Sequence, residues 1–135
     1  MIKFNIYENL PDNLGNFKDS RGAITDLFYN ANLNHVAIID SVPFAERGNH
    51  YHAQSVQHMF IISGSLEYWY KNDSMLDSKY ELCLPGDVIT SNKGEIHALR
   101  IGDQGCLFMA FTEGLRGGKD YESDTFRVDN IMKNV

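Results

Sequence analysis

Short apolar or alternating segments, separated every few positions by turn residues, run through the whole chain, whereas the repeat of an amphipathic helix is scarce. This pattern is typical of an antiparallel β-sandwich or β-barrel, in which each short strand turns alternate side chains toward the core. The sequence therefore predicts an all-β fold. The predicted strands are residues 2–6, 23–28, 36–39, 56–62, 66–70, 80–84, 88–90, 96–101, 106–112 and 125–128.

The length and composition of the chain predict one folded domain. It has 135 residues, within the range of about 100 to 150 in which single domains cluster. No linker, repeat or low-complexity tract divides it. Apolar residues make up 43% of the chain and charged residues 22%, which favours a packed core over disorder. We therefore expect residues 1–135 to form a single domain.

Charge and hydropathy exclude several kinds of partner. The net charge of −6 repels phosphate backbones and anionic lipids, so we expect no nucleic-acid binding and no membrane binding, although a local basic pocket for one small anion is compatible with it. No apolar run approaches the roughly 20 residues of a membrane span, and the first residues alternate like a strand rather than a signal peptide. Cys83 and Cys106 lack C-x-x-C spacing, which predicts a reduced, cytoplasmic protein with two buried cysteines.

The histidines carry most of the chemical information in this sequence. His50 and His52 stand two positions apart. Because alternate residues of a strand share a face, both imidazoles are expected to point into the same space. Gln57 follows five residues after His52, and His97 comes later in the chain, after a second group of glycines.

The spacing of these residues resembles the two motifs of the cupin superfamily. The first motif reads H-x-H, four residues, Glu, six residues and Gly, and it matches residues 50–64 with Gln57 in place of the Glu. The second reads Gly, five residues, Pro-x-Gly, two residues and His, and it matches residues 86–97 with Asn92 in place of the Pro. The resemblance implies a cupin jelly roll, a small antiparallel barrel in whose mouth the three histidines and Gln57 converge as a ligand site.

A narrower resemblance involves residues 19–28 and 47–52. Residues 19–22 (D-S-R-G) and 26–28 (D-L-F) resemble the D-x-R-G-x-F-x-E-x-F opening of the epimerases that act on dTDP-4-keto-6-deoxyhexoses, with Asp at the position of the Glu. Residues 47–52 (R-G-N-H-Y-H) resemble the R-G-L-H-Y-Q of these epimerases, whose His is the general base. They also resemble the R-G-x-H-A-H of the sugar 3,4-ketoisomerases, which keep a Gln at the position of Gln57. A third resemblance is to the metal-binding R-G-x-H-Y-H in the cupin domain of some capsule-sugar reductases.

The resemblance implies an isomerase or epimerase whose histidines move protons beside the carbonyl of a keto-deoxyhexose nucleotide. Histidine suits this chemistry because its pKa lies near neutrality, and arginine suits a diphosphate because it binds phosphate through two parallel hydrogen bonds. The catalytic candidates are His50, His52 and His97. The substrate-binding candidates are Arg21, Arg47, Gln57, Tyr68 and Trp69, of which the last two are expected to stack on a base or sugar.

Two other functions are compatible with the same residues. Three imidazoles and an amide oxygen suit one divalent transition metal, so His50, His52, Gln57 and His97 are also candidate ligands for Zn²⁺, Fe²⁺, Mn²⁺ or Ni²⁺ in a dioxygenase, lyase or other isomerase. A non-catalytic sugar-binding or sensor module would use the same pocket. The catalytic Tyr of the epimerases, and the Asp that orients their His, have no match in this sequence. No other cofactor is indicated.

Structural roles are the alternative for several residues. The two arginines also suit solvated turns, and Tyr68 and Trp69 also suit a core or a subunit interface. His35 and His58 are expected to be structural, with His58 on the strand face opposite Gln57. The glycine-rich segment 113–122 lacks the spacing of a phosphate-binding loop. It suits a lid or a segment exchanged with a partner subunit, but a surface loop is the favoured expectation.

The assembly state follows from apolar residues that one sandwich does not cover. Residues 59–62 are apolar on both faces of their predicted strand, whereas a strand with one solvent-facing side alternates with polar residues. Residues 68–70 add three aromatic side chains. This excess of apolar surface predicts a symmetric homodimer.

Overall fold

Strands dominate residues 1–114 and 120–133, which are the residues that this computed structural model describes. The prediction of an all-β fold is therefore confirmed, with one four-residue helix added near the C-terminal end. The elements are β1 (Ile2–Asn5), β2 (Asn16–Asp19), β3 (Gly22–Thr25), β4 (His35–Ser41), β5 (Glu46–Tyr51), β6 (Val56–Lys71), β7 (Lys79–Cys83), β8 (Asp87–Ser91), β9 (Ile96–Glu113), α1 (Asp120–Ser123) and β10 (Phe126–Arg127). A search of these residues for a helix with the length and hydropathy of a membrane span finds none.

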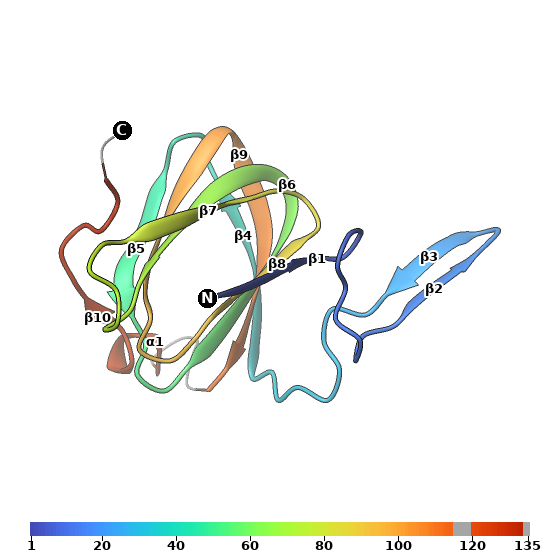
Figure 1. The fold of residues 1–135 in the computed structure, drawn as a ribbon, viewed down its shortest axis with the longest axis horizontal. Coiled ribbons are helices and arrows are strands. Elements are labelled where there is room, and N and C mark those ends of the chain that lie inside the picture. Colours follow the sequence, from blue (N-terminus) through green and yellow to red (C-terminus); the bar gives the residue numbers. More distant parts are fainter. Residues whose placement is uncertain (115–119, 134–135) are drawn as a thin grey trace.

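The long strands β6 and β9 form the centre of an eight-stranded sheet with the order β1-β8-β6-β9-β5-β10, to which β4 and β7 add as branches. All of its strand pairs are antiparallel. The first half of β6 pairs with β8 and the second half with β7, while the first half of β9 pairs with β5 and the second half with β4. Each long strand thus passes from one layer to the other, and the sheet curls into the jelly roll of Figure 1.

Two glycines let β6 and β9 bend where they cross. The four strands predicted within residues 56–70 and 96–112 are two continuous strands, because the turn signal at Ser63-Gly64 is a bulge in the β6–β9 register. Gly64 and Gly105 have φ angles of 78° and 73°. A Cβ atom on Gly64 would overlap the carbonyl oxygen of Gly105, so only glycine allows this close approach.

The inner faces of the two layers carry the hydrophobic core. Its buried residues are Met59, Ile61, Leu66, Tyr68, Cys83, Ile89, Leu99, Ile101, Cys106 and Phe108. Both cysteines are free and buried, which confirms the prediction made for them. Burial raises the pKa of Cys83 to about 12 and the pKa of Cys106 to about 11.

The outer face of β4 and β6 is apolar and partly exposed. Met59 and Ile61 point into the core, whereas Ile62 is 40% exposed. On β4, the side chains of Val36 and Ile38 are 53% and 67% exposed. The strand that is predicted to be apolar on both faces therefore has one face in the core and one that this chain leaves partly uncovered.

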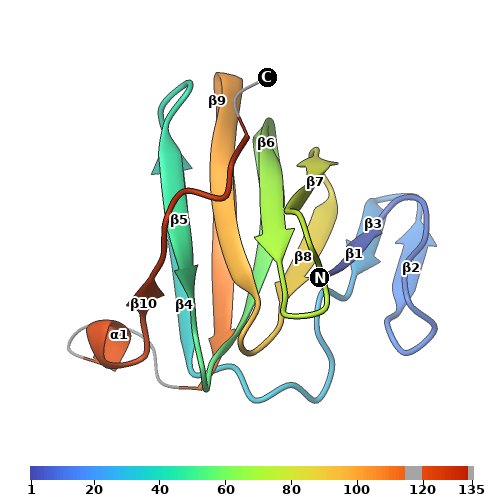
Figure 2. The same cartoon turned by 60° about the vertical axis from the view of Figure 1, so that its left-hand side comes forward.

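Strands β2 and β3 form a hairpin that, within the described residues, pairs with no other strand. Figures 1 and 2 show this hairpin projecting from the barrel near β1. Phe17 and Ile24 are register partners across the hairpin, and their residues are 66% and 69% exposed. Because a lone two-stranded hairpin is at best marginally stable in water, its apolar face requires a layer to pack against.

Half of the glycine-rich segment 113–122, which is predicted to be a lid, a partner-exchanged segment or a surface loop, lies outside the described residues, which omit 115–119. After this gap, α1 leads into β10, where the sequence predicts a short strand.

Candidate functional site

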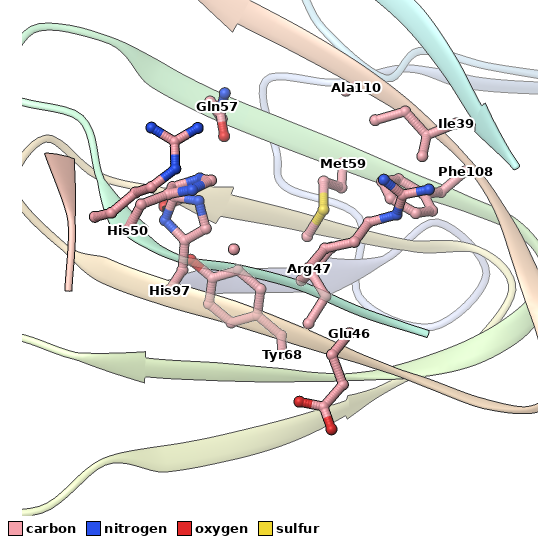
Figure 3. Close-up of a pocket in the computed structure, with 14 residues that line it drawn as sticks. Ile39, Glu46, Arg47, His50, Gln57, Met59, Tyr68, His97, Phe108 and Ala110 are labelled. Carbon is pink, nitrogen blue, oxygen red and sulfur yellow. Dashed lines mark hydrogen bonds between the residues drawn. The ribbon is translucent and has the colours of Figure 1, made fainter. Parts of the chain in front are cut away.

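A cavity of about 340 Å³ lies on the inner face of the jelly roll, and both motif regions contribute to its wall. Its lining residues are Ile39, Glu46, Arg47, Gly48, His50, Gln57, Met59, Tyr68, Ser91, His97, Leu99, Phe108, Ala110 and Arg127. Figure 3 shows His50 and His97 together on one side of the cavity and Arg47 on the other, with the sulfur atom of Met59 between them. The cavity therefore combines an apolar floor with a small number of polar groups, as small-molecule sites do.

A bulge in β5 turns Arg47 and His50 toward the same face. Residues three positions apart point to opposite faces of a regular strand. Here the register with β9 shifts between Gly48 and His50, so that His50 stands opposite His97. The extra residue, Asn49, has a φ of 55°, and a Cβ atom on Gly48 would come within 2.8 Å of the His97 carbonyl oxygen. Glycine at position 48 and asparagine at position 49 thus allow the bulge, and the bulge brings the cation of Arg47 and the imidazole of His50 to the same cavity.

The three motif histidines form one cluster. The ring centroids of His50 and His97 are 4.7 Å apart, and the rings are almost perpendicular at 86°. The centroid of His52 lies 4.8 Å from that of His50 and 5.4 Å from that of His97. His52 and His97 are buried, whereas His50 is half-buried. One candidate ligand atom on each ring lies within 4.8 Å of the others.

Hydrogen bonds at Nδ1 hold two of these rings. The Nδ1 atom of His52 lies 2.8 Å from the backbone oxygen of Asp124. The Nδ1 atom of His97 lies 3.0 Å from the Ser91 hydroxyl oxygen and 3.3 Å from the backbone oxygen of Glu95. A carbonyl oxygen can only accept, so the geometry favours a proton on Nδ1 of both rings. The neutral form of each imidazole then carries its lone pair on Nε2.

The ring of Tyr68 forms part of the cavity wall, but its hydroxyl group points elsewhere. The ring stacks on His97 at an interplanar angle of 13°, and the hydroxyl group donates to Oε1 of the buried Glu95 at 2.9 Å. Burial, together with the Glu95 carboxylate, raises the pKa of Tyr68 well above its usual 10.0. Tyr68 therefore stays protonated and offers a ligand its ring rather than its hydroxyl group.

Gln57 projects from β6 on the inner face, between Ser91 of β8 and Thr112 of β9 in the register. It is 9% exposed, and its Nε2 atom has no hydrogen-bond partner within the described part of the chain. Leaving a buried donor unpaired costs roughly 1–3 kcal/mol. The amide is therefore suited to donate to an oxygen of a molecule bound in the cavity.

Two arginines in the described part of the chain line the cavity, and of these the sequence analysis found only Arg47. The Nε atom of Arg47 donates to the Ser41 hydroxyl oxygen at 2.8 Å. Arg127 of β10 donates to both carboxylate oxygens of Glu122, at 2.9 and 3.0 Å. Although the sequence predicts a short strand here, nothing in it indicates that the strand pairs with β5 and brings Arg127 opposite His50.

Two of the predicted substrate-binding residues lie away from the cavity of their own chain. Arg21 is in the turn of the β2–β3 hairpin, where its side chain is 87% exposed and pairs with Asp19 at 2.6 Å. Trp69 lies in a separate cluster with Met132 and donates its Nε1 hydrogen to Glu67. The other three substrate-binding candidates line the cavity.

Asp124 fixes the loop that follows β5, and sequence analysis also missed it. Its carboxylate accepts hydrogen bonds of 2.9–3.2 Å from the backbone N–H groups of Ala53, Gln54 and Ser55 and from the Ser55 hydroxyl group. Burial raises the pKa of Asp124, but the hydrogen bonds outweigh it and hold the pKa below its usual value.

The histidine cluster fits a transition-metal ion by its donor chemistry. Ligating histidines donate from one ring nitrogen to a carbonyl group or similar partner and bind the metal through the other, which is the arrangement of His52 and His97. Nitrogens bound about 2.1 Å from one ion lie roughly 3.4 Å apart in a tetrahedral site. One candidate atom on each of the three rings lies within 4.8 Å of the others, which is somewhat wider than that spacing. Gln57 would add a neutral oxygen.

The fold is shared with sugar 3,4-ketoisomerases of known structure, although no protein-family model and no curated protein matches the sequence. A sugar 3,4-ketoisomerase from Helicobacter canadensis superposes with a TM-score of 0.71 at 18% identity, over 94% of this chain and 90% of that one. QdtA, a sugar 3,4-ketoisomerase from Thermoanaerobacterium thermosaccharolyticum in complex with TDP, gives 0.67 at 18%, over 86% and 85%. A variant of QdtA has been solved with TDP-4-keto-6-deoxyglucose.

Two further kinds of protein share the architecture. The dTDP-4-dehydrorhamnose 3,5-epimerase of Bacillus anthracis, with TDP and PPi bound, has a TM-score of 0.63 at 12% identity, over 79% of this chain and 73% of that one. The capsular polysaccharide assembling protein CapF of Staphylococcus aureus has a TM-score of 0.63 at 18% identity over 90% of this chain, which spans only 34% of CapF. The chain therefore has the jelly-roll fold that the sequence motifs predict, and it shares this fold with sugar 3,4-ketoisomerases, CapF and a dTDP-4-dehydrorhamnose 3,5-epimerase.

Proposed function

We propose that this protein is an isomerase or epimerase that acts on a keto-deoxyhexose nucleotide by histidine-mediated proton transfer. The observation that carries the proposal is the pair of imidazoles of His50 and His97, 4.7 Å apart on the wall of one cavity. Arg47, on the other side of the same cavity, offers a cation for a diphosphate. The TDP and TDP-sugar complexes of similarly folded enzymes support a ligand of this class.

In this reaction a ring nitrogen of His50 takes the proton from the carbon beside the ketone, and the electrons of that C–H bond form an enediolate with the carbonyl carbon. His97 then returns a proton. In an isomerisation the proton goes to the former carbonyl carbon, and the neighbouring hydroxyl proton moves to the former carbonyl oxygen. In an epimerisation it goes to the original carbon from the opposite face. For this step His50 has to start as the neutral base and His97 as the imidazolium that donates the proton.

His52 has a positioning role in this proposal. It is buried and belongs to the cluster, but it is not among the residues that line the cavity. Its Nδ1 atom is tied to the backbone of Asp124, and its ring centroid lies 4.8 Å from that of His50. His52 therefore lies next to His50 without lining the cavity, while His50 and His97 face the ligand.

Deuterium wash-in tests the proposal. Wild-type protein is incubated in heavy water with TDP-4-keto-6-deoxyglucose and related keto-sugar nucleotides, and exchange is followed by NMR. We expect exchange beside the ketone, and we expect His50→Asn to slow it by roughly 10²–10⁴-fold. His58→Asn is the matched control, because His58 bonds Thr90 and Glu113 and lies outside the cavity lining. No exchange with any keto-sugar nucleotide would refute the isomerase proposal.

A metal-dependent reaction is the second candidate, and the hydrogen bonds at Nδ1 of His52 and His97 favour it. His50, His52 and His97, with Gln57 as a neutral fourth donor, would hold the ion. A divalent ion there would polarise a carbonyl oxygen of the ligand. The residues of the chain would then orient the ligand and exclude water, and Arg47 would still bind its anionic group.

We also propose that the protein works as a homodimer in which the β2–β3 hairpin of one protomer covers the outer face of β4 in its partner. The hairpin has an apolar face, Phe17 and Ile24, without a layer beneath it. Strand β4 presents Val36 and Ile38 on an exposed face. Burial of each such side chain is worth roughly 1.5–3 kcal/mol, so joining these two surfaces stabilises both. A second copy is the occupant because it carries both surfaces, as a symmetric interface requires.

A further inference from the structure

Strand β10 is held firmly against the strand that carries His50. Phe126 and Arg127 pair with Tyr51 and His50 in antiparallel register. The ring of Phe126 stacks on that of Tyr51 with centroids 5.1 Å apart, and the backbone N–H of Val128 donates to the Asn49 carbonyl oxygen at 2.9 Å. These contacts flank Arg127 on both sides, so its backbone position at the cavity is well defined.

The side chain of Arg127 already holds an anion in the geometry of phosphate recognition. Its Nη1 and Nη2 atoms donate in parallel to the two carboxylate oxygens of Glu122. Both side chains are largely exposed, at 62% and 64%. An exposed ion pair contributes only about 0.2–1 kcal/mol, so the guanidinium group can exchange this carboxylate for a stronger anion at little cost.

We infer that Arg127 is an anion-binding residue of this cavity and that Glu122 occupies its guanidinium group until the diphosphate of a nucleotide ligand displaces the carboxylate. The inference rests on the proposed function, because a nucleotide ligand supplies the diphosphate. Arg127 and Arg47 both line the cavity, one on β10 and one on β5. A diphosphate has two anionic groups, so one of them can bind Arg127 while the other stays available to a second donor of the cavity.

The charge of the chain gives Glu122 a role in selectivity. The protein carries a net charge of −6, so anions reach the cavity only where a local cation offsets that field. Because the Glu122 carboxylate competes for Arg127, an anion needs a still higher affinity to bind there. Weakly binding monoanions then fail to displace Glu122, whereas a diphosphate with two strong acceptor groups succeeds.

Opposite effects of two variants test the inference. Calorimetric titration measures the affinity of the purified protein for TDP and, separately, for inorganic pyrophosphate. We expect Arg127→Ala to weaken TDP binding by roughly tenfold or more, because it removes a charge-assisted contact. We expect Glu122→Gln to strengthen TDP binding by roughly twofold to fivefold, because it removes the competing carboxylate.

Two controls separate this exchange from general effects of charge. Lys133→Ala removes a cation that pairs with the exposed Asp77 outside the cavity lining, and Glu81→Gln removes a negative charge that pairs with Lys3 on the surface. Both controls are expected to leave TDP affinity within about twofold of wild type. Thermal midpoints of all variants are recorded so that a folding defect is recognised.

Each outcome decides a different question. If Arg127→Ala and Glu122→Gln weaken binding alike, or if neither changes it, the ion pair is structural and the inference is wrong while the proposed function stands. If wild type binds neither TDP nor pyrophosphate, the inference and the nucleotide ligand are both refuted. If it binds pyrophosphate with the expected opposite effects but does not bind TDP, the anion site stands and the nucleotide part of the proposed function is wrong.

Discussion

The Nδ1 atom of His52 lies 2.8 Å from the backbone carbonyl oxygen of Asp124, a residue 72 positions further along the chain. This contact joins the motif histidines to the C-terminal segment. The carboxylate of the same aspartate binds the loop at residues 53–55, so both ends of one residue hold the region that follows β5. His52 is therefore oriented by a part of the chain that lies outside both cupin motifs.

Removal of the Asp124 side chain is expected to loosen this connection. In Asp124→Ala, the buried backbone N–H of Ser55 loses its acceptor, while the N–H groups of the more exposed Ala53 and Gln54 can turn to water. We expect the free energy of unfolding in urea to fall by about 1–3 kcal/mol. The control Asp77→Ala removes an exposed aspartate that pairs with Lys133. It should change the free energy of unfolding by less than about 0.5 kcal/mol. Equal stability of the two variants would contradict the anchoring role.

The sequence predicts the part of the site that local spacing defines. The two-residue spacing of His50 and His52 is a local pattern that indicates a shared face, and the resemblance to the two cupin motifs implies that His97 joins them. Arg127 and Asp124 depend on the pairing of β10 with β5, a contact between distant residues for which the chain has no local signal. Their side chains are ordinary for a surface loop, so composition does not reveal them either.

The prediction of strand boundaries from the sequence is limited by the same dependence on distant contacts. Ser63-Gly64 is a valid turn signal, because glycine at positive φ ends many strands. Here the same φ of 78° bends β6 around Gly105 and continues the strand, and only the contact with β9 decides between these outcomes.

The position of Arg21 is a third example: its motif predicts a role in binding, whereas its place relative to a cavity depends on where the hairpin packs.

The buried thiols make stability depend on pH in the alkaline range. Burial raises the pKa of Cys83 to about 12, against 9.0 for the unperturbed thiol. Below pH 9 the thiol is neutral in both the folded and the unfolded state. Between pH 9 and 12 it ionises only in the unfolded state, so stability falls as the pH rises.

Urea denaturation between pH 7 and 11 measures this dependence. Cys83→Ala is expected to be less stable than wild type at pH 7, because it leaves a small cavity, but to lose less stability above pH 9. Cys106→Ala should show the same flattening less strongly, since the pKa of Cys106 is raised only to about 11. A slope that is identical in wild type and Cys83→Ala would show that this thiol ionises freely in the folded protein.

Metal content distinguishes the two catalytic proposals. If the histidine cluster holds an ion, protein purified without a His-tag and supplied in turn with Fe²⁺, Mn²⁺, Ni²⁺ and Zn²⁺ should contain close to one equivalent of one of them. Gln57→Glu should strengthen metal binding because it adds a negatively charged ligand. His97→Ala removes a ligand itself, so it should weaken metal binding by more than the roughly 10- to 100-fold that is lost when a residue hydrogen-bonded to a ligand is removed. His58→Asn is the control. Less than about a tenth of an equivalent under all four conditions leaves only the acid–base mechanism.

The homodimer proposal predicts the molecular mass in solution and the effect of charged substitutions on the hairpin and on β4. Light scattering at micromolar concentration should give twice the 15.4 kDa of the chain. Ile38→Asp on β4 and Ile24→Asp on the hairpin each place a charge in the proposed interface, so each should shift the protein to monomer. Leu76→Asp is the matched control, because Leu76 is 91% exposed in the loop between β6 and β7 and is no part of either surface. A wild-type mass of 15.4 kDa would refute the dimer. A monomeric Ile38→Asp beside a dimeric Ile24→Asp would keep the dimer but show that the hairpin is not what covers β4.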